Sequence, residues 1–363
     1  MSFKLVKYKE PDFSQSQFTD APDAVTAPAP KDKVAPEHYH ATTIFPEYFK
    51  VKGQWLLAEE SRMDCVAVYE NGKIYVREFR NLKQGDLVFT GRTENCEDGI
   101  FVYPHGFDEG EGGHDEAFAF RQRRSRETAF SKDYDNIYEL LRHEREHGYV
   151  VWVMGPACAF DSDSREAFSK LVMNGYVDAL LAGNALATHD LEAGYRSTAL
   201  GQDIYTQISQ PGGHYNHIDT INQVRKAGSI EKFVAEQNIQ DGIMAACVQC
   251  KVPYVLTGSI RDDGPLPEVY ADVYEGQNAM RDQVKKSTTV ICLATTLHSI
   301  ATGNMTPSYR VLADGTVRPV YFYSVDVSEF AVNKLRDRGS LAVKTIVTNV
   351  QDFIVNVQRG LSL

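Results

Sequence analysis

Apolar strands alternate with amphipathic helices from residue 133 to the end of the chain, and this alternation constrains the fold most strongly. The run Tyr149–Ala157 (YVVWVMGPA) is apolar almost throughout, which is typical of a strand buried on both faces of a parallel sheet. Further predicted strands are VDALLAG, VPYVLTGS, TTVICLAT, PVYFYSVD and LAVKTIVT. Predicted helices cover 133–147, SREAFSKLVMNG, 184–198, YADVYEGQNAMRDQVKK, TLHSIATGN, SEFAVNKLRDR and VQDFIVNVQRGL. The pattern predicts that residues 133–363 form an α/β domain with a doubly wound parallel sheet.

The residues before this region differ in character. Residues 1–39 include a Pro-rich stretch without sustained periodicity, and we expect an irregular N-terminal arm that drapes over a neighbour. Residues 40–110 contain short β-rich runs separated by turn signals, and Asn71-Gly72 between two of these runs predicts a hairpin. We expect these residues to form a small β-rich domain. Residues 111–132 carry a basic cluster and are expected to form a solvated linker or a lid.

The composition argues against several classes of protein. The formal net charge of -11 argues against nucleic acid as the main partner, whereas it is compatible with a cationic small molecule. No apolar run reaches the ~18 residues that span a bilayer. The N-terminus has no apolar segment typical of a secretory signal, so we expect a cytoplasmic protein. The six cysteines are then expected to be reduced thiols.

Small and polar residues follow most of the predicted strands. They read AGNALATHD, TGSIRDDGPLP, ATTLHSIATGN and SVDVS along the chain. In a parallel sheet, ligands bind at the carboxyl ends of the strands, where small residues let the backbone approach a phosphate. The N–H groups at the start of each following helix can bind that phosphate. The turns therefore favour a nucleotide site over a purely structural sheet.

Acidic residues after two of the strands refine this prediction. Asp326 ends a strand, where a carboxylate can bind ribose hydroxyls and would favour NAD over NADP; it can also cap the next helix. After the first strand there is no intact G-x-G-x-x-G, and Asp161 and Asp163 stand where a phosphate would bind. We expect this first turn not to hold the phosphates, and its acids can instead cap the following helix.

Two segments offer side chains for chemistry. Arg261, Asp262 and Asp263 lie between a strand end and a Gly-Pro-Leu-Pro turn. Asp262 or Asp263 could act as a general base or bind a substrate ammonium group, and the alternative is a loop stabilised by an Arg–Asp pair. His214 and His217 follow Gly212-Gly213 and could contact substrate or cofactor, or be structural. No third ligand with suitable spacing is evident, so we predict no metal site.

Several long stretches resemble the archaeal-type ornithine cyclodeaminase family. These are GYVDALLAGNALATHDLE, INQVRKAGSI, GIMAACV, VPYVLTGSIRDDGPLPEV, ICLATTLHSIATGNM and LRDRGS. The same region forms the C-terminal part of cyanobacterial arginine dihydrolase/ornithine cyclodeaminase enzymes. It is also described as a conserved region of the plant lysine-ketoglutarate reductase/saccharopine dehydrogenase (LOR/SDH) proteins. The resemblance covers roughly residues 40–360.

The resemblance implies a Rossmann-like NAD-binding domain akin to deoxyhypusine synthase, with the small β-rich domain helping to enclose the substrate. The NAD contacts that it implies are Asn184, Ala185, Gly258, Ser259, Thr296, Leu297, His298 and Asp326. The substrate is expected to face the catalytic candidates Asp262 and Asp263, with Arg261, Asn304, His214 and His217 as further candidate contacts. By analogy with similar enzymes, we expect a homo-oligomer, either a dimer or a tetramer.

The implied reaction is redox-neutral. NAD takes a hydride from Cα of ornithine, the δ-amine attacks the resulting imine, ammonia leaves, and the same NADH reduces the cyclic imine to proline. A base must first deprotonate the α-ammonium, because a nitrogen without a lone pair cannot assist hydride departure. The alternatives are an amino-acid or opine dehydrogenase or imine reductase that releases NADH, a non-catalytic NAD-sensing module, and a metal-dependent hydrolase.

Overall fold

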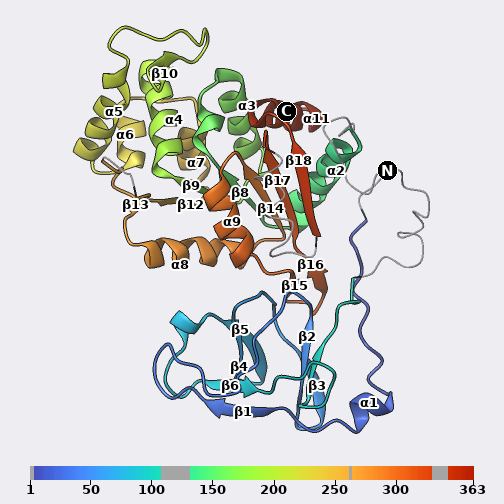
Figure 1. Cartoon of the computed structure of the whole chain (residues 1–363). Coiled ribbons are helices and arrows are strands. Elements are labelled where there is room, and N and C mark those ends of the chain that lie inside the picture. Colours follow the sequence, from blue (N-terminus) through green and yellow to red (C-terminus); the bar gives the residue numbers. More distant parts are fainter. Residues whose placement is uncertain (1–3, 108–130, 261–263, 329–341) are drawn as a thin grey trace.

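A computed structural model of the chain describes residues 4–107, 131–260, 264–328 and 342–363. It contains a larger α/β domain and a smaller β-rich domain, which lie one beside the other (Figure 1). The predicted linker 111–132 lies almost entirely outside the described residues, and so does most of the predicted helix SEFAVNKLRDR.

The α/β domain is built on a seven-stranded, all-parallel sheet, as predicted. Its strands are β8 (Val150–Met154), β9 (Ala179–Gly183), β12 (Tyr254–Thr257), β13 (Val269–Tyr270), β14 (Thr289–Leu293), β17 (Tyr321–Asp326) and β18 (Ala342–Val347). Their spatial order is β13-β12-β9-β8-β14-β17-β18. The chain therefore builds outward from β8 in one direction and then returns to the other side of β8 with β14. Apart from the two-residue edge strand β13, this is the strand order of a dinucleotide-binding Rossmann fold.

Helices cover both faces of this sheet (Figure 1). Side chains of β8 alternate between two hydrophobic clusters, with Trp152 and Met154 in one and Val151 and Val153 in the other. The first cluster is completed by α2 (Ser131–His147), α3 (Ser162–Met173), α4 (Asn184–Arg196), α5 (His214–Ala227), α6 (Ile230–Glu236), α7 (Ile243–Cys250) and α11 (Val350–Gly360). The second is completed by α8 (Val273–Val284) and α9 (Thr296–Met305). A strand buried on both faces explains the continuous apolar run in the sequence.

The small domain consists of two antiparallel sheets. One has the order β1-β6-β4-β5 and the other β3-β2-β7. Their strands are β1 (Val25–Pro28), β2 (Glu47–Val51), β3 (Gln54–Leu57), β4 (Val66–Glu70), β5 (Lys73–Arg77), β6 (Leu87–Thr90) and β7 (Ile100–Val102). Asn71 and Gly72 connect β4 to β5 with φ values of 52° and 82°, the left-handed conformation of a tight hairpin turn. The predicted hairpin is confirmed.

The segment before residue 40 differs from the irregular arm expected from its prolines. Strand β1 pairs antiparallel with β6 of the small domain. The buried Lys50 ammonium group donates to the carbonyl oxygens of Phe18, Thr19 and Ala21 at 3.0, 2.9 and 2.7 Å. The segment therefore packs on its own chain. Its strand was missed because Pro28 disfavours a central strand, yet proline is tolerated on an edge strand such as β1.

The two domains meet along α8 and the hairpin of β15 (Tyr309–Val311) and β16 (Val317–Pro319). The buried Arg281 of α8 lies 2.5 Å from the Glu60 carboxylate of the small domain and donates to the carbonyl oxygen of Met305 at 2.8 Å. The Tyr309 hydroxyl donates to the carbonyl oxygen of Ala58 at 2.7 Å. These contacts attach the small domain to the hairpin that precedes β17. The small domain therefore lies at the edge of the sheet where β17 begins.

No helix within the described ranges is long and apolar enough to cross a membrane.

Candidate functional site

The strand order reverses between β8 and β14, and the turns that follow these two strands touch one another. Gly155 donates from its N–H to the carbonyl oxygen of Leu293 at 2.8 Å. A Cβ on Gly155 would lie only 2.0 Å from the carbonyl oxygen of Ala294. Ala294 itself has a φ of 47°, which is strained for alanine. Ligands of open α/β sheets bind at such a reversal, so this edge is the candidate site.

Three helices at this edge have side-chain caps. The Asp161 carboxylate accepts from the Ser164 N–H at 2.9 Å at the start of α3, which confirms the capping alternative for this acid. Asp272 accepts from the N–H groups of Tyr274 and Glu275 at the start of α8. The third helix is α11, where the Asn349 side chain accepts from the N–H groups of Gln351 and Asp352. These helix starts satisfy their own N–H groups.

The helices on either side of β8 differ from these three. Helix α4 follows β9 with Gly183 as its N-cap, and α9 follows β14 with Thr295 as its N-cap. Among the described residues, neither start receives a side-chain cap. The predicted NAD contacts Asn184 and Ala185 begin α4, while Thr296, Leu297 and His298 begin α9. Two helix starts with open N–H groups therefore flank the central strand, where their positive ends can bind an anion.

His298 connects three strand ends. Its Nε2 lies 2.9 Å from the Thr257 hydroxyl at the end of β12. Its Cε1 is so close to Gly183, at the end of β9, that a Cβ there would lie 3.3 Å away. Burial lowers the pKa of His298, so the ring is neutral at neutral pH. The structure thus brings together the predicted residues of the turns after β9, β12 and β14.

The turn after β12 packs against the same edge. The Gly258 N–H donates to the carbonyl oxygen of Tyr270 at 2.9 Å, and the Asn184 side-chain oxygen accepts from the Leu266 N–H at 3.0 Å. Ser259 is exposed. The catalytic candidates Asp262 and Asp263, with Arg261, lie outside the described residues. They are nevertheless bracketed in sequence by Ser259 and Leu266, both of which belong to this edge.

Asp326 ends β17, on the far side of β14 from β8. Its carboxylate accepts from the Ser328 N–H at 2.9 Å, and the helix that the sequence predicts after it lies outside the described residues. A role in binding ribose stays a prediction. The apolar side chains of Val327, next to Asp326, and of Leu297, in the first turn of α9, are 60% and 75% exposed. Such exposure leaves apolar surface at this edge that a ring could cover.

The remaining predicted substrate contacts are not brought to these turns. Asn304 is exposed in the last turn of α9, eight residues after Thr296, which is about 12 Å along the helix axis. His214 is exposed at the start of α5. The ring of His217 lies 5.9 Å from that of His189 on α4, and no hydrogen-bond partner for its buried Nδ1 is found among the described residues. His217 therefore packs beside α4, and its neighbour His189 lies 5.5 Å from the ring of Phe160, in the turn after β8.

Sequence reasoning missed Gly155 and Ala294. The signal for Gly155 was a glycine and a proline directly after the first apolar strand, but its close contact depends on a turn that comes much later in the chain. In addition, no cluster of three or more histidine, cysteine, aspartate or glutamate side chains that could hold a metal ion occurs in the part of the chain that the structure describes.

Comparison with known proteins finds relatives of this chain in sequence and in structure. The family model described as arginine dihydrolase ArgZ-like, C-terminal, Rossmann fold, matches residues 135–357. An ornithine cyclodeaminase of Methanocaldococcus jannaschii is 39% identical over 336 residues, which cover 90% of this chain and 75% of that protein. A crystal structure of a conserved LOR/SDH protein from Methanococcus maripaludis has a TM-score of 0.84 at 35% identity, covering 94% of this chain and 98% of that one. AgrE in a ternary complex with ornithine and NAD⁺ has a TM-score of 0.60 at 33% identity, covering 94% of this chain and 46% of AgrE.

Proposed function

Since this chain belongs to the family of the ArgZ-like C-terminal domain and the archaeal ornithine cyclodeaminases, we propose that it is an NAD-dependent ornithine cyclodeaminase. It would convert ornithine to proline and release ammonia. The observation that carries this proposal is the pair of helix starts at α4 and α9, which lack side-chain caps in the described structure and flank the central strand. The ternary complex of AgrE with ornithine and NAD⁺ supports the choice of cofactor and substrate.

The residues at this edge fit a dinucleotide. Backbone N–H groups at Asn184 and Ala185 and at Thr296 would face the two phosphates. Gly155 carries no side chain between them, and the exposed Leu297 can pack against a ring. At the first turn, by contrast, the Asp161 carboxylate occupies the helix start and would repel phosphate. We therefore place the pyrophosphate at α4 and α9, with Gly258, Ser259 and Asp326 as further contacts.

The side chains would handle the protons of the reaction. When bound, NAD supplies the hydride acceptor and returns the hydride at the end of the cycle. Asp262 or Asp263 would accept the proton of the substrate α-ammonium, and Arg261 beside them would orient the substrate carboxylate. His298 would stay neutral, because both burial and its position in the first turn of α9 disfavour a positive charge. It would thereby hold Thr257 in place without adding charge beside the nicotinamide.

The test begins with the nucleotide. The purified protein is denatured, and the released nucleotide is identified and titrated back. We expect NAD, and we expect ornithine to give equal amounts of ammonia and proline without accumulating NADH. Net NADH formation would instead support a dehydrogenase, and bound NAD without amino-acid-dependent ammonia release would support an NAD-sensing module. Finding neither released dinucleotide nor NAD binding would overturn the proposal.

The proposed base is tested by Asp262→Asn and Asp263→Asn. Loss of the base is expected to lower kcat by roughly 10²- to 10⁴-fold in at least one variant while NAD binding is retained. The matched control is Asp314→Asn, in the exposed turn between β15 and β16, for which wild-type kcat is expected. Wild-type kcat in both test variants would rule out a base in this loop.

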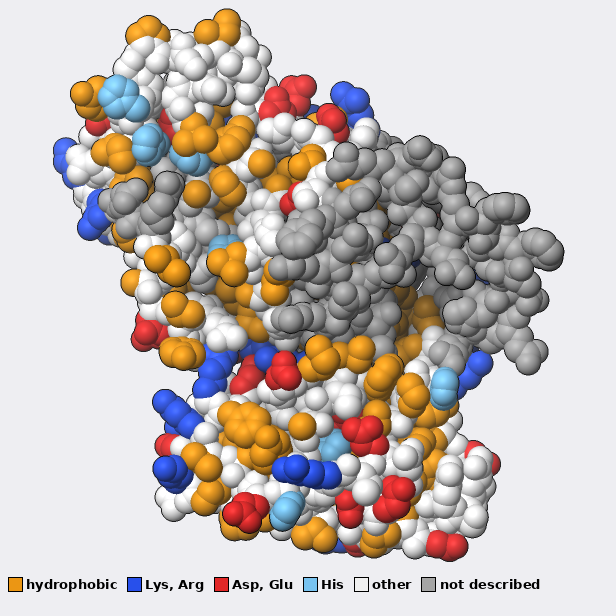
Figure 2. Space-filling view, viewed as in Figure 1, with side chains coloured by type: hydrophobic (Ala, Val, Ile, Leu, Met, Phe, Trp, Pro, Cys, Tyr) orange, Lys and Arg blue, Asp and Glu red, His pale blue; other side chains and the backbone are white. Residues whose placement is uncertain are grey.

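We also propose that the chain assembles as a dimer or tetramer. Exposed apolar side chains are scattered over the hairpin of β10 (Thr198–Ala199) and β11 (Gln202–Asp203), the loop after it and the start of α5 (Figure 2). They are Leu200, Tyr205, Ile208, Tyr215 and Ile218. The molar mass in solution tests the assembly.

The six cysteines are free thiols, five of them buried, which suits a reducing compartment such as the cytoplasm.

A further inference from the structure

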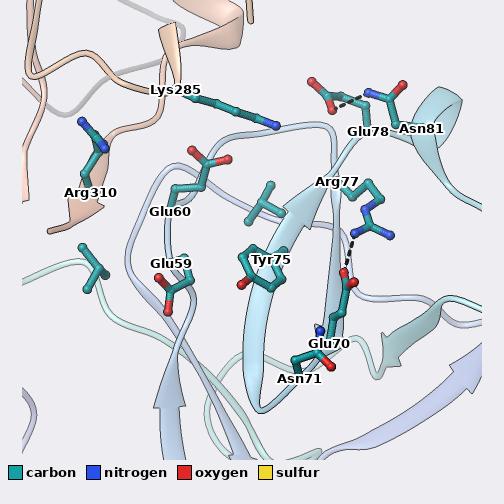
Figure 3. Close-up of a pocket in the computed structure, with 12 residues that line it drawn as sticks. Glu59, Glu60, Glu70, Asn71, Tyr75, Arg77, Glu78, Asn81, Lys285 and Arg310 are labelled. Carbon is teal, nitrogen blue, oxygen red and sulfur yellow. Dashed lines mark hydrogen bonds and ion pairs between the residues drawn. The ribbon is translucent and has the colours of Figure 1, made fainter. Parts of the chain in front are cut away.

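We propose that the pocket between the two domains is a second binding site, specific for a free α-amino acid and separate from the C-terminal edge of the sheet. The pocket has a volume of ≈ 630 Å³, within the range of small-molecule sites. The small domain contributes Glu59, Glu60, Glu70 and Tyr75, and the α/β side contributes Lys285 and Arg310 (Figure 3). Figure 2 shows basic and acidic side chains gathered along the line where the domains meet.

The α/β side of the pocket presents two cations, Lys285 and Arg310, of which Arg310 feels the nearby charge of the Glu60 carboxylate. No ion pair of Lys285 or Arg310 within 4.0 Å is found among the residues that the structure describes. Lys285 is exposed and extends into the pocket (Figure 3). The Arg310 guanidinium is half-buried and donates to the carbonyl oxygen of Lys286, and burial lowers its pKa. Because the Glu60 carboxylate is already bound by Arg281, the charges of Lys285 and Arg310 can still stabilise an incoming carboxylate here.

The small domain presents acids that are bound only loosely. The Glu59 carboxylate lies 3.1 Å from Lys73, an exposed pair that solvent can readily replace. Glu70 is half-exposed and pairs with Arg77 at 2.9 Å. Figure 3 shows both acids on the side of the pocket opposite Arg310 and Lys285, with the Tyr75 ring among them. An ammonium group would therefore be stabilised on this side.

The deepest acids of the pocket are already neutralised. Glu60 lies 2.5 Å from Arg281, and Glu78 contacts both Arg62 and Arg281. What remains is one wall with Lys285 and Arg310, facing another with Glu59 and Glu70, where Arg77 accompanies Glu70. A simple anion would be repelled by Glu59 and Glu70, and a simple cation would be repelled by Lys285 and Arg310. A zwitterion satisfies both walls, and the exposed face of Tyr75 favours one with a cationic side chain.

The test is calorimetric titration of the NAD-free, full-length protein with L-arginine and, separately, with inorganic phosphate. L-arginine is expected to bind and phosphate is not. Lys285→Met should weaken L-arginine binding by about tenfold or more, since it removes one charge-assisted contact. Because NAD is absent, the result does not depend on the proposed reaction.

The matched control is Lys286→Met, the next residue along the chain. Lys286 is also exposed, but its ammonium group lies over the Tyr149 ring at 5.8 Å and does not line the pocket. The affinity of the Lys286→Met variant for L-arginine should equal that of the wild type. Glu59→Gln provides a second variant on the opposite wall, with the same expected weakening, should Lys285→Met fail to fold.

Three results would overturn the proposal. One is the absence of heat with L-arginine up to about 10 mM, since ligands of free metabolite pools bind in the micromolar to millimolar range. Another is phosphate binding as tight as that of L-arginine, which would make this a site for any anion. The last is L-arginine binding that Lys285→Met and Glu59→Gln leave unchanged, which would place the ligand elsewhere.

Discussion

At the scale of single residues, the candidate site depends on positions where a side chain is absent or held neutral. Gly155 has a φ of -84°, which any residue can adopt, so its importance comes from space and not from backbone conformation. The carbonyl oxygen of Ala294 fills the volume that a Cβ would need. The ring of His298, in turn, lies against Gly183, where a Cβ would lie 3.3 Å from it.

Gly155→Ala is expected to destabilise the fold by about 1–3 kcal/mol, because two turns must separate to accommodate a methyl group. The same separation should weaken NAD binding, which titration of the purified variant would measure. The control is Gly315→Ala, where φ is 84° but no atom lies within 4 Å of the new Cβ. Left-handed strain alone should cost about 1–2 kcal/mol there and leave NAD affinity intact. Wild-type NAD affinity in Gly155→Ala would separate this turn from the cofactor site.

His298 makes stability depend on pH. The unfolded chain has an ordinary imidazole pKa of about 6.5, whereas burial lowers the pKa in the folded state. Between these two values the unfolded state binds more protons, so stability is lost as the pH falls below about 6.5. The stability advantage of the wild type over His298→Asn is therefore expected to be greatest above pH 7 and to shrink toward pH 5. Urea unfolding of both proteins across this range measures the difference, and a constant difference would contradict the assignment.

At the scale of elements, the sequence predicts where strands and helices occur better than it predicts which of them lie side by side in the fold. The six long strands of the large sheet were found because their apolar runs are continuous, as burial on both faces requires. Strand β13 was missed because it has only two residues, and β1 was missed because it contains Pro28. The contact between Gly155 and Ala294 depends on the order of the strands in the sheet. No local sequence pattern encodes that order.

The starts of the helices likewise include features that local sequence predicts and contacts that only the fold reveals. The cap at Asp161 could be anticipated, since an acid directly before a helix is a strong local signal. The turns at Asn184, Gly258 and Thr296 were also predicted from their small residues. The contact between Thr257 and His298 joins two strand ends, and only the folded sheet reveals it.

Leu297→Glu tests whether α9 binds a phosphate. A carboxylate in the first turn should stabilise the helix by about 0.3–1 kcal/mol through the dipole. It should also weaken NAD binding by about tenfold or more, because it repels the phosphate. Stability and affinity would thus change in opposite directions, as thermal unfolding and NAD titration would reveal.

The matched control for this change is Val273→Glu. Val273 begins α8 and is 77% exposed, against 75% for Leu297, but α8 is already capped by Asp272. NAD affinity should be unchanged in the control. Equal affinity in both variants would exclude α9 from the phosphate site.

At the scale of the whole molecule, Arg281 joins the two domains. Its guanidinium contacts Glu60 and Glu78 of the small domain and the carbonyl oxygen of Met305 at the end of α9. The small domain is thereby connected to the helix that begins at the candidate site. A buried arginine that serves both domains should make them unfold together.

Arg281→Met is expected to destabilise the protein by about 3–5 kcal/mol, because buried carboxylates lose their counterion. It should also split a single calorimetric transition into two. The control is Arg142→Met, since Arg142 likewise contacts a carboxylate, that of Glu139, and a carbonyl oxygen, that of Gly360, but is 45% exposed. Its cost should stay below about 1 kcal/mol. One unsplit transition in Arg281→Met would show that other contacts join the domains.

The position of β8 also affects how the protein is made. One edge of β8 pairs with β9, which is synthesised soon after it, whereas the other edge pairs with β14, with Thr289 beside Val150. While the ribosome completes α4 to α8, that second edge stays open, with a wholly apolar strand behind it. Open apolar edges recruit other chains, so we expect this edge of the nascent chain to be prone to mispairing until β14 emerges.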